Sequence, residues 1–201
     1  FGIYSFVNDN NQEIYFMVMN NVYYTDLNIT TIYDMKGSTQ GRHTIIKVKN
    51  PTEIIVYKDL DWKSHNIKLN LKDAMSQAYM VQIERDLTFL SELNIMDYSL
   101  LIAVYNYDKN KENNPMILRK SKVHQNIGNA YLFTYNHAGM ENKGKTRIFW
   151  CGIIDILQEY NAKKMIERNL KSITNDSSKI SCADPEFYKN RMISFLKSDV
   201  I

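Results

Sequence analysis

Cysteine is scarce in this sequence: among 201 residues there are two, Cys151 and Cys182. A disulfide framework or a cysteine zinc site needs more thiols at closer spacing, so we expect neither. Cys151 lies in an apolar run, which is typical of a reduced core thiol in an intracellular protein. No apolar run approaches the roughly eighteen residues of a membrane-spanning helix and no signal-like segment opens the chain, so we expect neither a membrane span nor secretion.

Two further features are missing, namely internal repeats and the Gly-x4-Gly-Lys-Ser/Thr order of a Walker loop. The hydrophobic content of 44% and the charged content of 23% are ordinary for a globular protein. A chain of 201 residues suits one domain, or a large part of one, with a real core. No initiator Met precedes Phe1, so we expect the sequence to be part of a longer protein.

The net charge of +3 is mild, but basic residues gather between positions 109 and 147, where eight of them face two acidic residues. A local surplus of this kind indicates an anionic partner, either a membrane surface or nucleic acid. A solvated loop is the simpler alternative. Aromatic residues do not interleave with the cations as a stacking platform requires, so we expect no nucleic-acid binding.

The hydrophobic period changes in the middle of the chain. From 71 to 93 the apolar residues recur every three or four positions, which predicts a helix facing the core with Leu71, Met75, Tyr79, Ile83, Leu87 and Leu90. Residues 99–105 then form a continuous apolar run, which predicts a strand buried on both faces. Residues 147–154 predict a second apolar strand, and the runs 13–19, 30–35 and 53–57 predict three more.

Two acids stand at the ends of these buried elements: Asp97 at the helix-to-strand junction, and Asp155 after the strand 147–154. An unpaired buried carboxylate is costly, so such a site usually supplies a metal, a cation or a proton. Two acids placed in this way fit phosphoryl transfer, in which one orients the attacking hydroxyl and the other holds magnesium. Taken alone, Asp97 can equally cap a turn.

The loop 36–42 (KGSTQGR) contains two glycines, two hydroxyls and two cations. Such a composition lets the backbone approach phosphate oxygens while the cations neutralise their charge, although a hairpin turn with incidental charges has the same composition. Two helix starts are also predicted: Asn70 as an N-cap with Asp73 in the first turn, and Asp184 as an N-cap with Pro185 following it.

Three ordered blocks, 33–38 (YDMKGS), 95–101 (IMDYSLL) and 152–158 (GIIDILQ), resemble the signature blocks of the phosphatidylinositol phosphate kinases. Two more blocks, 58–62 (KDLDW) and 184–191 (DPEFYKNR), match in character. The resemblance implies an α+β, kinase-like large lobe of the SAICAR synthase-like class, with an antiparallel sheet and helices and with most of the small lobe absent. Residues 1–19 would end the small lobe, residues 20–23 would form the hinge, and residues 24–201 would form the large lobe, with a basic insertion at about 108–146 and an activation loop at about 156–184.

The resemblance also assigns roles to residues. Asp97 would orient or deprotonate the substrate hydroxyl, Lys36 would act beside it, and Asp155 would bind Mg²⁺. Lys36 and Arg42 would be the cations of the substrate phosphate site. The adenine of ATP would pair with the hinge, at Met19, Asn20, Asn21 and Val22.

The activation loop would meet the membrane and select the lipid. Glu167 falls where the enzymes acting on phosphatidylinositol 4-phosphate carry Glu. The basic pair Lys163 and Lys164 is displaced one residue from their pattern.

The expected activity is transfer of the ATP γ-phosphate to phosphatidylinositol 4-phosphate, at the cytoplasmic face of the plasma membrane. Kinases acting on the 5-phosphate or the 3-phosphate, or a non-catalytic phosphoinositide-binding module, are the alternatives, and a homodimer stays open. The sequence contains no glycine-rich nucleotide loop and no lysine-bearing strand before the hinge. We therefore expect residues 1–201 alone to be nearly inactive.

Overall fold

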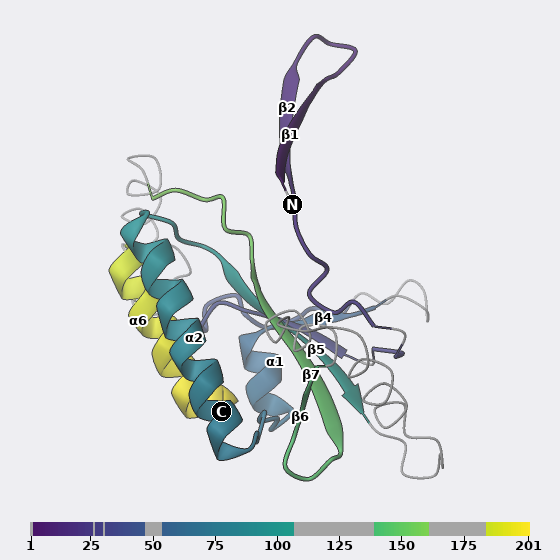
Figure 1. The fold of residues 1–201 in the computed structure, drawn as a ribbon, viewed down its shortest axis with the longest axis vertical. Coiled ribbons are helices and arrows are strands. Elements are labelled where there is room, and N and C mark those ends of the chain that lie inside the picture. Colours follow the sequence, from purple (N-terminus) through teal and green to yellow (C-terminus); the bar gives the residue numbers. More distant parts are fainter. Residues whose placement is uncertain (1, 26, 30, 47–53, 107–138, 161–183) are drawn as a thin grey trace, which may run out of the picture.

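The computed structural model describes residues 2–25, 27–29, 31–46, 54–106, 139–160 and 184–201. Its centre is a five-stranded sheet with the strand order β4-β3-β5-β7-β6, covered on one face by helices (Figure 1). The strands are β3 (Thr31–Met35), β4 (Val56–Tyr57), β5 (Ser99–Asn106), β6 (Met140–Glu141) and β7 (Arg147–Ile154). Only β3 and β4 are parallel, and every other neighbouring pair is antiparallel. The α+β class is confirmed.

The predicted apolar strands are confirmed in β5 and β7, which pair along their whole length from Ser99↔Ile154 to Asn106↔Arg147. Side chains of β5 alternate between two cores, as a strand buried on both faces requires. Ile102 belongs to the core beneath the helices, whereas Ala103 belongs to the core on the opposite face together with Trp150.

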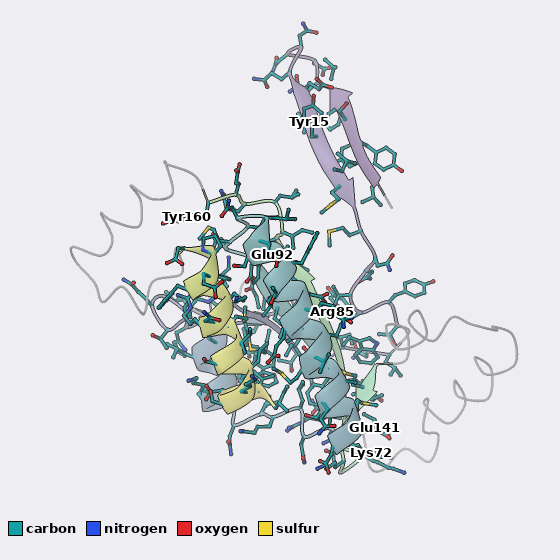
Figure 2. The ribbon with its side chains drawn as sticks, turned by 60° about the vertical axis from the view of Figure 1, so that its left-hand side comes forward. Tyr15, Lys72, Arg85, Glu92, Glu141 and Tyr160 are labelled. Atoms are coloured by element: carbon teal, nitrogen blue, oxygen red, sulfur yellow. The ribbon has the colours of Figure 1, made fainter. Side chains whose placement is uncertain are left out.

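The helical layer consists of α1 (Asp59–Ser64), α2 (Asp73–Glu92) and α6 (Pro185–Phe195), which continues as a π-helical turn, Leu196–Val200. Helices α2 and α6 run antiparallel, since Ser91 hydrogen-bonds Glu186 while Lys197 pairs with Glu84. Figure 2 shows them side by side, with α2 running from Lys72 to Glu92. The predicted inward face of α2 is confirmed, because Ile83, Leu87 and Leu90 are buried. Within the described residues, no helix is long and apolar enough to cross a membrane.

One predicted helix start is wrong and the other is confirmed. Helix α2 takes Lys72 as its N-cap, whereas Asn70 adopts a left-handed φ of 44° and its carbonyl accepts a hydrogen bond from the Lys143 N–H at 2.8 Å. The chain turns at Asn70 to meet the 142–146 turn, and so the helix begins later. At α6, the Asp184 carboxylate accepts from the Phe187 N–H at 2.9 Å, as an N-cap should.

The strand predicted at 13–19 is β2 (Glu13–Val18), paired with β1 (Gly2–Val7) in a hairpin that projects away from the sheet and helices (Figure 1). Tyr4 stacks on Phe16 with ring centroids 5.7 Å apart, yet most of the hairpin's side chains are exposed. The strand predicted at 53–57 is confirmed only as the two-residue β4.

Candidate active site

Asp97 and Asp155 lie at the same end of the five-stranded sheet. Asp97 precedes β5 by two residues and Asp155 directly follows β7, and the antiparallel register places Ser99 opposite Ile154. The pairing continues beyond the strands, because the Met96 N–H donates to the Gln158 carbonyl and the Tyr160 N–H donates to the Asn94 carbonyl. The two acids, distant in sequence, therefore stand on adjacent segments.

Both acids adopt the left-handed backbone conformation, with φ of 64° at Asp97 and 61° at Asp155. Non-glycine residues seldom adopt it, although Asp tolerates it better than most. Backbone strain of this kind clusters at ligand-binding and catalytic positions, where the surrounding structure holds it in place. Five other non-glycine residues share this conformation, so it describes the turns on which the two acids stand and does not by itself assign them a function.

Asp97 forms an ion pair with Lys36, at 2.7 Å between Nζ and Oδ1. The same ammonium also donates to the Asp97 backbone carbonyl. Lys36 reaches this site because it directly follows β3, whose last residue, Met35, lies opposite Leu100 of β5. The side chains of Lys36 and Asp97 are 15% and 32% exposed respectively, so the pair is partly shielded and a ligand can still reach it. The sequence analysis predicted a role for both residues but did not predict their contact with each other.

Asp155 is exposed, and no hydrogen bond or ion pair of its carboxylate to another described residue is found. Within the described ranges no group of three His, Cys, Asp or Glu side chains forms a metal cluster. Magnesium in nucleotide enzymes is commonly held by one or two carboxylates together with the substrate's phosphates. A single exposed carboxylate on the segment that pairs with the one carrying Asp97 fits that donor set, and the metal role of Asp155 stays a prediction.

Three backbone N–H groups of the loop after β3 bind an internal carboxylate, and the predicted approach of the loop to phosphate stays a prediction for the rest of it. The N–H groups of Lys36, Gly37 and Ser38 all donate to one oxygen of Asp59, Oδ1, at 3.0, 2.7 and 3.3 Å. Asp59 is 1% exposed at the start of α1. An internal carboxylate therefore uses the donors that were expected to hold phosphate, and it fixes the backbone from which the Lys36 side chain extends.

Arg42 binds the same buried carboxylate, that of Asp59. Its Nε donates to Asp59 Oδ2 at 2.6 Å and its Nη2 donates to Asp34 Oδ1 at 2.9 Å, and the residue is 8% exposed. Burial lowers the pKa of this guanidinium, but the charge of Asp59 and the hydrogen bonds to Asp59 and Asp34 outweigh that effect and raise it overall. The phosphate-binding role of Arg42 stays a prediction, although its guanidinium already serves two carboxylates.

Among the predicted hinge residues, Met19, Asn20 and Asn21 are exposed, and Val22 packs on β7. A Cβ atom at Gly152 would lie 2.9 Å from Cγ2 of Val22, so the absence of a side chain at Gly152 admits this contact. Because Gly152 precedes Asp155 by three residues, the segment 20–23 passes close to the end of the sheet that carries the acids. Lys163, Lys164, Glu167 and Cys182, with most of the basic insertion and of the activation loop, lie outside the described residues.

Sequence reasoning missed Asp59, Tyr188 and Arg191 as neighbours of the site. Tyr188 hydrogen-bonds the carbonyl of Tyr98, and Arg191 hydrogen-bonds the carbonyl of Lys36. The available signal was charge complementarity between the two acids of block 58–62 and the two cations of block 36–42. The capping pattern at Asp184 predicted the helix α6, but it did not predict which of the helix's side chains face the site.

The fold and the site together describe an α+β domain that presents a Lys–Asp pair and an exposed carboxylate at one end of its central sheet. Residues 1–199 match the family described as phosphatidylinositol-4-phosphate 5-kinase, and the chain belongs to that family of phosphoinositide phosphate kinases.

The relatives are named for two different lipid substrates. The chain is 29% identical to a phosphatidylinositol 4-phosphate 5-kinase of Plasmodium falciparum, over 98% of this chain and 12% of the relative. It is 26% identical to phosphatidylinositol 5-phosphate 4-kinase type-2 gamma of Xenopus tropicalis, over 97% of this chain and 54% of the relative. It is 25% identical to the phosphatidylinositol 4-phosphate 5-kinase its3 of Schizosaccharomyces pombe, over 94% of this chain and 32% of the relative. The chain thus spans about half the length of these relatives or less.

Proposed function

We propose that this chain carries the catalytic end of a lipid kinase that transfers the ATP γ-phosphate to the 5-hydroxyl of phosphatidylinositol 4-phosphate. The observation that carries the proposal is the Lys36–Asp97 pair on the segment next to Asp155, at one end of the sheet. Family membership supports the reaction class. In this arrangement residues 1–19 end a small lobe, residues 20–23 form a hinge, and residues 24–201 form a kinase-like large lobe.

Each residue of the site has a distinct part in the reaction. Asp97 accepts a hydrogen bond from the inositol hydroxyl and takes its proton as the hydroxyl oxygen bonds to the γ-phosphorus of ATP. The bond from that phosphorus to the β,γ-bridging oxygen breaks, and ADP leaves. The Lys36 ammonium lies 2.7 Å from the Asp97 carboxylate. Its positive charge stabilises the negative charge that accumulates on the transferred phosphoryl group. Asp155 would hold magnesium, and the ion would supply positive charge that offsets the charge of the nucleotide's phosphates.

The nucleotide and the lipid would use different segments of the chain. The packing of Val22 on Gly152 supports adenine binding at residues 19–22, close to the carboxylate that would hold the nucleotide's magnesium. Lys163, Lys164 and Glu167 would select the headgroup, and the basic residues between 109 and 147 would hold the protein at the anionic cytoplasmic face of the plasma membrane.

A 4-kinase acting on phosphatidylinositol 5-phosphate is the second candidate, because the relative from Xenopus tropicalis carries that name. The test supplies the full-length protein with labelled ATP and vesicles containing the 3-, 4- or 5-monophosphate, and identifies the bisphosphate isomer formed. The proposal predicts the 4,5-bisphosphate from the 4-phosphate. The same product from the 5-phosphate alone supports the second candidate, and vesicle binding without any product supports a non-catalytic module.

A further inference from the structure

Helix α6 hydrogen-bonds the backbone of Lys36 and the backbone of Tyr98, the residue after Asp97, although it supplies neither member of the Lys36–Asp97 pair. From these contacts we propose that Tyr188 and Arg191 of α6 are positioning residues that set the geometry of this pair for phosphoryl transfer. The inference rests on the proposed function and adds two residues to it.

Tyr188 acts on the Asp97 side. Its side chain is fully buried, and its hydroxyl donates to the carbonyl of Tyr98, the residue after Asp97, at 2.5 Å. The two tyrosine rings also meet edge to face, with centroids 4.7 Å apart. Burial, and then the nearby Asp97 charge, raise the pKa of Tyr188 well above its usual value, so its hydroxyl remains a donor. This bond holds the Tyr98–Ser99 peptide, one residue beyond the left-handed Asp97.

Arg191 acts on the Lys36 side, almost one helical turn further along α6. Its Nη2 donates to the Lys36 carbonyl at 3.3 Å, while the guanidinium lies over the Tyr188 ring at 4.9 Å from its centroid. The two side chains therefore stack on each other and hydrogen-bond the backbones that carry the two members of the pair.

Lys36 is held from the opposite direction as well. Its N–H donates to Asp59 of α1 at 3.0 Å, so the backbone of Lys36 is fixed between α1 and α6. The next residue, Gly37, passes so close to α6 that a Cβ there would lie 3.0 Å from the Met192 Cα. The backbone of Lys36 is therefore held from both sides, and the distance between Lys36 and Asp97 depends on their two side chains.

Lys36 and Asp97 are 61 residues apart in sequence, so the pair forms only while their two segments keep their relative position. The contacts of Tyr188 and Arg191 are made to these two segments. A displacement of about 1 Å at reacting groups can lower a rate by about 100-fold, even when its cause is remote. The contacts therefore predict an effect on turnover beyond what core packing alone would give.

The test uses the full-length protein, labelled ATP and vesicles containing phosphatidylinositol 4-phosphate. Tyr188→Phe keeps the ring and removes one donor, and we expect kcat to fall about 10- to 100-fold with KM for ATP and lipid unchanged. The matched control is Tyr33→Phe, which also removes a buried tyrosine hydrogen bond, to His65 Nδ1 at 2.7 Å, but touches neither Lys36 nor Asp97. We expect the control to lower the melting temperature to a similar extent and to retain kcat.

A double-mutant cycle separates positioning from stability. In an Asp97→Asn background, Tyr188→Phe should leave the residual rate unchanged, because the group it positions no longer accepts a proton. If the two losses multiply instead, or if Tyr188→Phe matches the control in kcat, the positioning role is overturned. Full activity of Asp97→Asn itself would instead overturn the proposed function.

Arg191→Lys is the variant to test if Tyr188→Phe folds poorly. It keeps the positive charge but loses the planar fork that reaches the Lys36 carbonyl. We expect the same fall in kcat with unchanged KM, and wild-type kcat in a folded Arg191→Lys protein would overturn the proposal.

Discussion

At the residue scale, the site combines side chains of opposite character. Asp59 is buried and fully engaged by backbone N–H groups and Arg42, whereas Asp155 is exposed in a left-handed conformation. Removing a buried and satisfied carboxylate destabilises the fold because its partners are left buried and unpaired, whereas an exposed carboxylate is available to a ligand. Substitutions at the two kinds of position should therefore separate stability from activity.

Replacing Asp155 should leave the stability of the protein nearly unchanged. Asp155→Gly relieves the left-handed strain but increases the entropy of the unfolded chain, so we expect the free energy of unfolding to change by no more than about 1 kcal/mol. Asp59→Asn should cost several times as much, about 3 kcal/mol or more, because it leaves the Arg42 charge buried with a weaker partner. Denaturant unfolding of the two variants checks this, and an equal loss in both would contradict the distinction.

Asp61 should contribute to stability in a pH-dependent manner. Burial raises the pKa of its carboxyl, but hydrogen bonds from the Thr44 hydroxyl and from the Lys58 and Thr44 N–H groups, with the His43 charge, lower it below 3.8 overall. A lowered folded-state pKa means that the contribution is present above pH 3.8 and is lost as the pH falls through the folded-state value. The melting temperature of the wild type should therefore fall more steeply below pH 4 than that of Asp61→Asn. Parallel curves between about pH 2 and 6 would contradict this.

At the element scale, the end of the sheet is fixed by close contacts between segments that lie far apart in sequence. The loop after β3 lies between α1 and α6, and the segment 20–23 lies on β7. Glycine is required at both contacts for different reasons, which suggests two experiments.

Gly37 and Gly41 form a matched pair, since both have a left-handed φ, 66° and 65°. A Cβ at Gly37 would meet the Met192 Cα at 3.0 Å and the Arg191 carbonyl at 3.3 Å, whereas a Cβ at Gly41 would meet nothing within 4 Å. We expect Gly41→Ala to cost about 1 kcal/mol from backbone strain alone, and Gly37→Ala to cost about 1–3 kcal/mol more. Unfolding midpoints check this, and equal losses would mean that α6 does not press on the loop.

Gly152→Ala tests the proposed hinge. Its new methyl would lie 2.9 Å from the Val22 side chain and should displace segment 20–23. We expect KM for ATP to rise in the full-length protein, and Val22→Ala in the same chain to restore it by making room. A KM for ATP that is unchanged in the single variant would contradict nucleotide binding at residues 19–22.

The sequence predicted the elements of this end better than their contacts. Strand β7 and its terminal Asp155 follow from an apolar run that stops at an acid, and β5 follows in the same way. The Lys36–Asp97 contact could not be predicted, because it joins segments 61 residues apart and no local pattern records such pairing. The contact of Asp59 with the loop after β3 left only the charge complementarity of two blocks, which does not say which acid meets which cation. Asn70 was wrongly taken as a cap because a long-range bond to Lys143 holds it outside the helix.

At the scale of the whole molecule, the five-stranded sheet brings the proposed hinge, Lys36, Asp97 and Asp155 to one region, while α2 and α6 support that region from one face. The exposed β1–β2 hairpin stands apart from this core (Figure 1). The low activity expected of residues 1–201 alone stays a prediction, so the decisive assay belongs to the full-length protein.

The central claim is that Lys36, Asp97 and Asp155 form one phosphoryl-transfer site. Its most direct test compares wild-type and Asp155→Asn full-length protein in transfer of labelled γ-phosphate from ATP to phosphatidylinositol 4-phosphate vesicles. The account predicts labelled 4,5-bisphosphate from the wild type and a more than about 100-fold lower rate from Asp155→Asn at equal thermal stability. An equal rate from the two proteins would contradict it.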